Sequence, residues 1–248
     1  MARLLRRGEN PPETEELPRM SFLEHLEELR RRLIVCLMAI GAGTVVGFLL
    51  SERVVEWLLR LAEHVPGLSF QAIEVPEKFV ASMRLALTTG VALALPVIIY
   101  QAWQFLRPGL YPKERRYLRI GLPLVTLFFA AGVAFSYFVA LPAALRFLLR
   151  FGSEQVRTQP QLQPYLSFVS NLLFWSGVSF ETPIFLFFLA KIGIVDWRKL
   201  SRWRKYAFLV ICVLAAAITP TPDPVNMMLV ALPLYALYEC GILLARFA

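Results

Sequence analysis

The sequence has few charged residues for its length. Only 18% of its 248 residues are Asp, Glu, Lys or Arg, whereas 57% are hydrophobic. Soluble domains carry about 25% charged residues, so this chain has too few polar side chains to cover an ordinary aqueous surface. The excess apolar surface requires lipid, and the composition therefore predicts an integral membrane protein.

Residues that usually carry chemistry are also scarce. The chain has only two histidines, His25 and His64, and it has no Gly-rich phosphate loop or nucleophile elbow. This weighs against metal-dependent and acyl-transfer activity. The cysteines lie inside apolar runs at spacings that fit no metal site, and we expect them to be small packing residues: Cys36, Cys212 and Cys240. The sequence predicts no enzyme and no cofactor.

The apolar runs are long and do not alternate with polar residues as the strands of a membrane barrel do. Helices are therefore the predicted spanning elements, and we expect an all-α membrane protein. Residues 1–20 are polar and contain three prolines, which predicts a disordered tail, and residues 21–248 are expected to form one transmembrane domain. The six predicted spans cover residues 33–50, 79–106, 118–141, 165–190, 206–218 and 225–245.

Local signals add detail to these spans. The pattern Ser-Phe-Leu-Glu from Ser21 is a capping box, and it predicts a helix that lies at the membrane surface before it enters the bilayer. Residues 51–78 are amphipathic and are expected to form short helices over the opposite membrane face. Pro142 is expected to end the third span, and Pro233 and Glu239 to interrupt the sixth. The fourth span contains Glu181 and Pro183 and must kink or be locally unwound.

The fifth predicted span is short. Its 13 residues make a helix of about 20 Å, whereas the hydrocarbon core of a bilayer is about 30 Å thick. Local thinning of the bilayer or polar flanking residues must compensate.

The positive charges are unevenly distributed over the predicted loops. Nineteen Lys and Arg lie on the side of the two termini, six lie on the other side, and Arg84 falls inside the second span. This asymmetry places both termini in the cytoplasm. The net charge of +8 is therefore interpreted as a topology signal, and no nucleic-acid partner is predicted.

Glu181 is the most informative charged residue inside a predicted span. A carboxylate at the bilayer centre costs about 2.5 to 3.5 kcal/mol, and such residues are usually functional. On a helical wheel Ser167, Ser170 and Asn171 share its side of the helix, which predicts a polar groove. The alternative is a structural carboxylic acid that is hydrogen-bonded to a neighbouring helix.

Two further acids lie near the ends of spans. Glu239 is two turns before Arg246, and we expect it to approach the membrane interface or to pair with a basic loop. Asp223 follows a Pro-rich turn at the start of the last span, where it is either a helix cap or part of a site.

Two acids outside the spans admit two interpretations. Glu28 and Glu114 lie among many cations, so they are either partners of Arg32, Arg115 or Arg116 in weak surface pairs, or a site for a ligand. Since carboxylates pair bidentately with guanidinium groups, two acids at one membrane surface are suited to a ligand with two arginines.

Several motifs resemble one family, TatC, the multispanning subunit of the twin-arginine protein translocase. The likeness extends from Ser21 to Phe247 and keeps the order of the motifs. They are HLEELRRRL at 25–33, PVIIYQAWQFLRPGLYPKERR at 96–116, AFSYF at 134–138, YLSF at 165–168, GVSFETP at 177–183 and TPTPD at 219–223.

The resemblance implies a function that the residues alone do not give. Proteins of this family recognise signal peptides with consecutive arginines and, with small single-span subunits of the TatA and TatB type, export folded proteins across the bacterial cytoplasmic membrane using the protonmotive force. The implied fold is a concave, glove-like bundle whose fifth and sixth spans are short. Self-association in a receptor complex and contact with membrane lipid are also implied.

The resemblance also assigns residues. By motif, the signal-peptide site comprises Glu28, Glu114, Arg30, Phe105 and Arg116. Glu181 and Pro183 match the polar position inside the membrane, and Asp223 matches the acid of the loop on the far side. The family often has a Gln four residues after that acid, where this chain has Met227, so a role of that amide either is lost or passes to Asn226.

Two other functions remain open at this point. A secondary transporter also uses short, Pro-interrupted helices around a buried acid, but no second, matching half is visible. An intramembrane protease needs Ser and His or two Asp within the spans, yet both histidines lie outside them and Asp196 and Asp223 fall on opposite sides.

Overall fold

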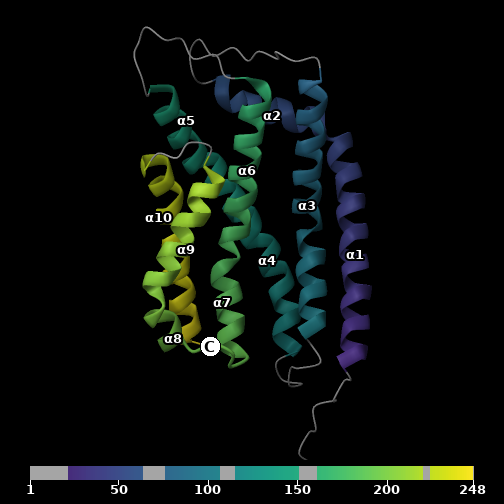
Figure 1. The fold of residues 1–248 in the computed structure, drawn as a ribbon, viewed down its shortest axis with the longest axis vertical. Helices are drawn as coiled ribbons and strands as arrows, with labels where there is room; N and C mark the ends of the chain where they lie inside the picture. The colour runs from purple at the N-terminus through teal and green to yellow at the C-terminus, as the bar shows by residue number, and fades with distance from the viewer. Residues whose placement is uncertain (1–21, 64–75, 107–114, 151–160, 220–223, 248) are drawn as a thin grey trace, which may run out of the picture.

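The computed structural model describes residues 22–63, 76–106, 115–150, 161–219 and 224–247, and the structural statements below refer to these residues. They form a bundle of helices (Figure 1). In chain order these are α1 (Phe22–Leu49), α2 (Ser51–Glu63), α3 (Glu77–Leu106), α4 (Arg115–Phe135), the π-helical turn η2 (Ser136–Ala140), α5 (Leu141–Arg150), α6 (Leu162–Phe180), α7 (Thr182–Lys191), α8 (Trp197–Arg202), α9 (Arg204–Ile218) and α10 (Pro224–Arg246).

Within the described residues, four helical segments are long and apolar enough to cross a membrane. They are Leu23–Leu49, Glu77–Phe105, Pro123–Phe147 and Leu162–Lys191, and they overlap the first four predicted spans. The helices α9 and α10 occupy the fifth and sixth predicted spans. We call the end of the bundle where α1 begins the near end, and the end that α2 covers the far end (Figure 1).

Two of the three proline predictions were wrong. The third span does not end near Pro142, because η2 and α5 continue the helix to Arg150. Pro142 falls in the first turn of α5, directly after the π-helical turn, where a missing N–H interrupts least. Similarly, α10 runs through Pro233 without a break, since a bundle in lipid tolerates proline where neighbouring groups re-satisfy the backbone.

The predicted surface stretch at the start of α1 is not a separate element. Residues 22–32 continue the axis of one helix that ends at Leu49 (Figure 1). Ser21 lies outside the described residues, so the capping box stays a prediction.

Glycine lets α1 and α3 approach each other closely. A Cβ atom at Gly43 would lie 2.5 Å from the carbonyl oxygen of Gly90, and one at Gly47 would lie 2.5 Å from that of Ala86. Only small residues permit such backbone contact between membrane helices. This contact fixes the position of α1, whose other faces expose large apolar side chains such as Leu37 and Val45.

The amphipathic segment after α1 forms the expected helix at the far end. Leu58 of α2 is 1% exposed, and its carbonyl oxygen accepts a hydrogen bond of 3.0 Å from the hydroxyl of Tyr165 in α6. Trp57 stacks on Tyr137 of η2 with ring centroids 4.3 Å apart. These contacts attach α2 across the bundle (Figure 1).

The helix α9 has 15 residues, and at a rise of 1.5 Å per residue it is about 22 Å long. In Figure 1 the far ends of α9 and α10 lie well below those of α3 and α6. Only α9 and α10 themselves are short, because α5 extends above them toward the far end on the same side (Figure 1).

The packing of α1 on α3 predicts a difference between two glycines that are two residues apart. The substitution Gly43→Ala should destabilise the protein by about 1 to 3 kcal/mol, because its Cβ meets backbone that cannot move aside. Thermal unfolding in detergent, followed by circular dichroism, measures the effect. The control is Gly41→Ala, since a Cβ there has no atom within 4 Å; equal melting temperatures for the two variants would contradict the packing.

Candidate functional site

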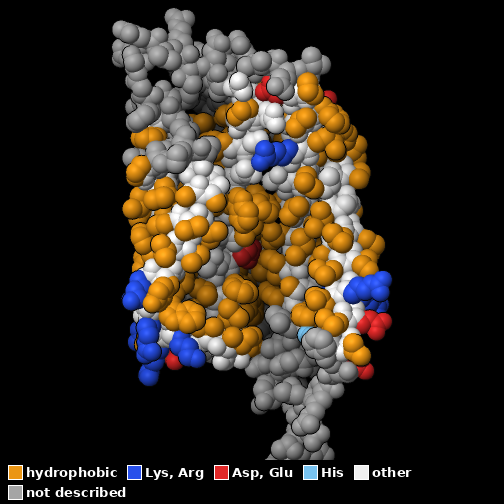
Figure 2. All heavy atoms as spheres, viewed as in Figure 1, with side chains coloured by type: hydrophobic (Ala, Val, Ile, Leu, Met, Phe, Trp, Pro, Cys, Tyr) orange, Lys and Arg blue, Asp and Glu red, His pale blue; other side chains and the backbone are white. Residues whose placement is uncertain are grey.

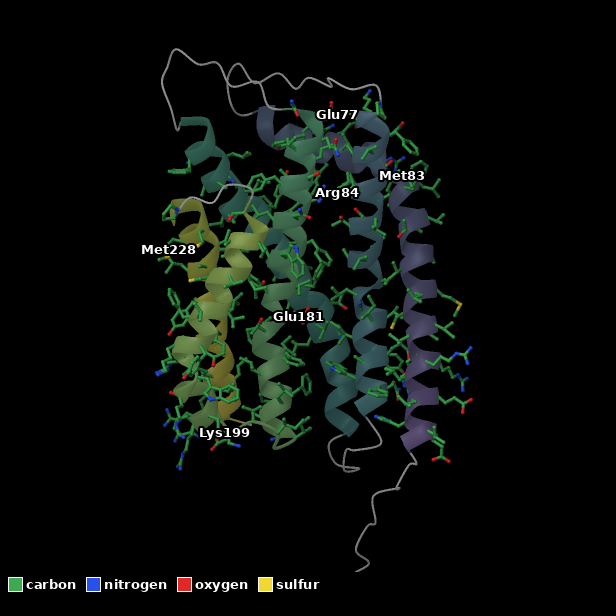
Figure 3. All side chains as sticks on the ribbon, in the orientation of Figure 1. Glu77, Met83, Arg84, Glu181, Lys199 and Met228 are labelled. Carbon is green, nitrogen blue, oxygen red and sulfur yellow. The ribbon has the colours of Figure 1, made fainter. Side chains whose placement is uncertain are left out.

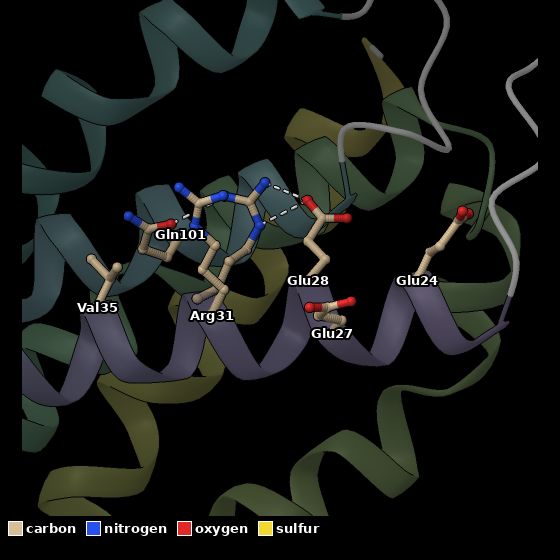
Figure 4. A pocket seen from close by; sticks show the side chains of 7 residues that line it. Glu24, Glu27, Glu28, Arg31, Val35 and Gln101 are labelled. Atoms are coloured by element: carbon tan, nitrogen blue, oxygen red, sulfur yellow. Dashed lines mark hydrogen bonds and ion pairs between the residues drawn. The ribbon is translucent and has the colours of Figure 1, made fainter.

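A cavity of about 770 Å³ opens at the near end between α1 and α3. Its lining is mostly charged, with three acids, two arginines and one amide (Figure 4). The lining residues are Glu24, Glu27, Glu28, Arg31, Arg32, Val35 and Gln101. All but Gln101 belong to α1, because residues three and four apart share one helix face.

Glu28 is the least exposed of the three acids that line this cavity. Its side chain is 19% exposed, and its Oε1 accepts hydrogen bonds from both Nε of Arg32, at 2.9 Å, and the Nη2 atom of the same guanidinium. Arg32 also donates to Gln101 Oε1 across the helix contact, at 3.1 Å (Figure 4). Of the two interpretations of Glu28, the pair with Arg32 is present in the structure, and this pair leaves the interpretation as a ligand site open.

The second carboxylate oxygen of Glu28, Oε2, accepts no hydrogen bond from the described residues. This oxygen is buried, and His25 Nδ1 lies 4.0 Å from it. The His25 ring stacks on Phe105 of α3 with centroids 4.2 Å apart. One oxygen of a buried carboxylate therefore remains able to accept from an added donor.

The structure brings some predicted site residues together and not others. Glu28 and Phe105 meet through His25, whereas Arg30 is exposed and does not line the cavity. Glu114 and Asp223 lie outside the described residues, and so do the side chains of Arg116 and Asn226.

Sequence reasoning missed two residues of this site, His25 and Gln101. His25 is three residues before Glu28, and Gln101 is four residues before Phe105. Helical spacing puts His25 on the same face of α1 as Glu28, and Gln101 on the same face of α3 as Phe105. Only the packing of α1 on α3 brings these two faces together.

Glu181 lies where the fourth span breaks. It separates α6 from α7, and its N–H bonds to the carbonyl oxygen of Val178, three residues back, at 3.1 Å. Pro183 is buried in the first turn of α7, and a proline there cannot donate to the carbonyl four residues before it. The helix is interrupted at Glu181, which confirms the prediction that this span kinks or locally unwinds at Glu181 and Pro183.

The surroundings of Glu181 differ from the prediction. The carboxyl lines a cavity of about 190 Å³ whose other walls are apolar side chains of α3, α4 and α7, and the residue after α7. They are Ile99, Ala102, Trp103, Val125, Ile184, Phe185, Phe188, Leu189 and Ile192. Ser167, Ser170 and Asn171 do not line it, so the predicted polar groove is wrong; Asn171 is ten residues away along the helix, about 15 Å.

Neither oxygen of Glu181 has a hydrogen-bond partner of good geometry among the described residues, although both are buried. The space-filling view shows an acidic side chain at this level within an otherwise apolar, hollowed face (Figure 2), and the stick view labels it as Glu181 (Figure 3). The backbone of Phe129 in α4 interacts with this carboxyl, so the structure leaves both interpretations of Glu181 open.

Glu239 of α10, in contrast, is paired. Its Oε2 accepts a hydrogen bond of 2.7 Å from Arg204 at the start of α9, which confirms the predicted pair with a basic loop. Among the described residues no three His, Cys, Asp or Glu side chains form a possible metal site.

Comparison with known proteins identifies the family. A profile described as Sec-independent protein translocase protein (TatC) matches residues 24–233. The chain belongs to the TatC family. This confirms the resemblance seen in the motifs and makes the chain a membrane protein of protein transport and a component of a Sec-independent translocase.

Individual TatC proteins are similar over almost the whole chain. The TatC of Deinococcus radiodurans is 41% identical over 244 residues, covering 95% of this chain and 88% of that protein. The TatC of Carboxydothermus hydrogenoformans is 38% identical, with 92% and 93% covered. A crystal structure described as the twin arginine translocase receptor TatC superposes with a TM-score of 0.82 at 35% identity, over 90% of this chain and 98% of that one.

The isolation of the Glu181 carboxyl predicts that it does not stabilise the fold. A buried polar group without a partner costs about 1 to 3 kcal/mol, so Glu181→Leu should unfold at the same or a higher temperature than the native chain. The matched control is Glu239→Leu, which removes an ion pair worth up to about 1 kcal/mol and should unfold earlier. A larger loss of thermal stability in Glu181→Leu than in the control would refute this account.

Proposed function

We propose that this chain is the signal-peptide receptor and core scaffold of a twin-arginine translocase. It binds signal peptides with two consecutive arginines at the near end and exports folded proteins, driven by the protonmotive force. It has no chemistry of its own and acts by binding. The observation that carries the proposal is the half-satisfied, buried carboxylate of Glu28 in a charged cavity, in a member of the TatC family.

The arginine pair docks by charge and geometry. One guanidinium binds Oε2 of Glu28, while Arg32 keeps Oε1 and holds the carboxylate in place. The other guanidinium binds Glu114, and Arg30, Phe105 and Arg116 complete the site. Arginine is preferred over lysine, because its planar fork makes two parallel hydrogen bonds to a carboxylate and an ammonium group does not.

The apolar part of the signal peptide then follows into the apolar face beside Glu181. That face has apolar walls for such a segment and one unpaired carboxyl for a polar group of a partner helix. Small single-span subunits of the TatA and TatB type assemble there, and Asp223 acts at the far side.

The proposal includes a topology. The chain has six spans in a concave, glove-like bundle, lies in the bacterial cytoplasmic membrane, and has both termini and the near end on the cytoplasmic side. The charges support it: Arg30, Arg31 and Arg32 of α1 and the cations of α8 and the start of α9 gather at the near end, and positive residues favour the cytoplasm.

Removal of both acids tests the receptor role. The variant Glu28→Ala plus Glu114→Ala should bind a twin-arginine peptide at least about tenfold more weakly, because it loses charge-assisted hydrogen bonds of about 1.5 to 3 kcal/mol. The preference for the arginine peptide over its twin-lysine analogue should disappear. Fluorescence anisotropy with the purified protein in detergent measures both affinities.

The matched control for this experiment is Glu52→Ala plus Glu56→Ala, which removes two exposed acids of α2 at the far end. This variant should bind as the native chain does. If the near-end variant keeps the native affinity and preference, the receptor proposal fails, and a secondary transporter with a carboxylate site at Glu181 becomes the better interpretation.

A second variant separates docking from transport. Glu181→Ala should bind the twin-arginine peptide with unchanged affinity, because its cavity lies apart from the cavity at Glu28. Export of a folded reporter and copurification of single-span subunits should both fall. Normal export, or loss of peptide binding in a folded variant, would contradict the separate roles.

A further inference from the structure

Arg84 is a cation inside a membrane-spanning helix. It belongs to α3, seven residues after the helix begins at Glu77, which places it about 10 Å below the far end of that helix. Its side chain is exposed. A charged side chain at such a depth is costly unless it meets an anion or water.

No acid in the described part of the chain serves as this anion. The ion pairs found there involve other residues. Glu181 lies on the same face (Figure 3), but its cavity contacts α3 at Ile99 and Trp103. Ile99 is fifteen residues beyond Arg84, or about 22 Å along the helix, so the two charges are too far apart to pair.

The short helices α9 and α10 bring a different anion within reach. The far ends of α9 and α10 lie well below that of α3 and close to the level of Arg84 (Figures 1 and 3). A bilayer thins next to a short span so that its headgroups stay near the helix ends. Arg84 itself lies between α6 and α3 (Figure 3), and α5 extends above α9 and α10 (Figure 1), so a far-leaflet phosphate at the level of these short helix ends comes within reach of Arg84 on the face between α3 and α6.

We propose that Arg84 binds the phosphate of a far-leaflet phospholipid and holds it on the open face between α3 and α6. Arginine suits this ligand because its guanidinium binds phosphate oxygens bidentately, and its long side chain extends toward the interface. The bound headgroup keeps the bilayer thin beside Glu181. The inference does not depend on signal-peptide binding, since it uses only membrane insertion and the lengths of the helices.

Lipid retention tests the contact directly. Native mass spectrometry of the full chain in micelles, with added phosphatidylglycerol, should show about tenfold lower occupancy of the tightest lipid in Arg84→Gln than in the native chain. Arg84→Lys, which keeps the charge, should lose less. Galactosyl diacylglycerol, which has no phosphate, should bind all three proteins alike.

The matched control is Lys78→Gln, which removes another exposed cation of α3 at the far end. It should leave retention of phosphatidylglycerol almost unchanged. Equal occupancy in native and Arg84→Gln proteins would overturn the proposal. An equal loss in Lys78→Gln would also overturn it, because general attraction of anionic lipid would then suffice.

A second measurement leaves Arg84 in place. Because Gly47 faces Ala86 and Gly43 faces Gly90, Val45 of α1 and Thr88 of α3 lie at the same level. Nitroxide labels are attached to single cysteines introduced at these two positions, after the three native cysteines have been replaced. The depth of each label in the bilayer follows from the ratio of its collision rates with oxygen and with a water-soluble nickel chelate. The label at position 88 should collide with the nickel chelate more often, relative to oxygen, than the label at position 45. Equal ratios would show that the bilayer has the same thickness at both positions and would refute the proposal.

Discussion

The architecture depends on the absence of water from the bilayer core. Every backbone N–H and C=O group inside lipid must be paired within the protein, and in a single unclosed chain helices satisfy this requirement. The described residues accordingly form helices between Phe22 and Arg246 apart from short connections. Inside the four long spans of this described part, irregular backbone is confined to a π-helical turn before Pro142 and to the break between α6 and α7 at Glu181. Polar side chains then gather at the two ends of the bundle or at a few positions inside it.

Close packing of helices brings residues from different helices together in the near-end cavity. The backbone contact of Gly43 with Gly90 holds α1 against α3, and for this reason Gln101 and Phe105 of α3 reach Arg32 and His25 of α1. The described lining of the near-end cavity is thus a product of helix packing. The same frame leaves the outer faces of α1 apolar and exposed, as suits contact with lipid.

The acids of the bundle fall into two groups, according to whether their carboxylate oxygens accept hydrogen bonds. Glu239 is paired with Arg204, and Glu77 accepts from the backbone N–H of Gln163 at 3.0 Å, so these residues join elements of the structure. Glu28 and Glu181 keep buried oxygens without partners among the described residues. Such oxygens destabilise the protein until a donor pairs with them. The proposed receptor role uses sites of this kind, because recognition would supply the missing donors.

The sequence by itself determined the membrane class, the positions of the helices and the break at Glu181, because hydrophobic run length and proline are local signals that lipid enforces. It also predicted the pairs of Glu28 with Arg32 and of Glu239 with a basic loop, each as one of two alternatives, because helical spacing and charge suffice for these. Only the tertiary structure decided that His25 and Gln101 join Glu28, that the walls around Glu181 are apolar, and that Pro142 and Pro233 do not end their helices. Each of these outcomes depends on which helix lies against which, and contacts between distant segments leave no periodic pattern in one sequence.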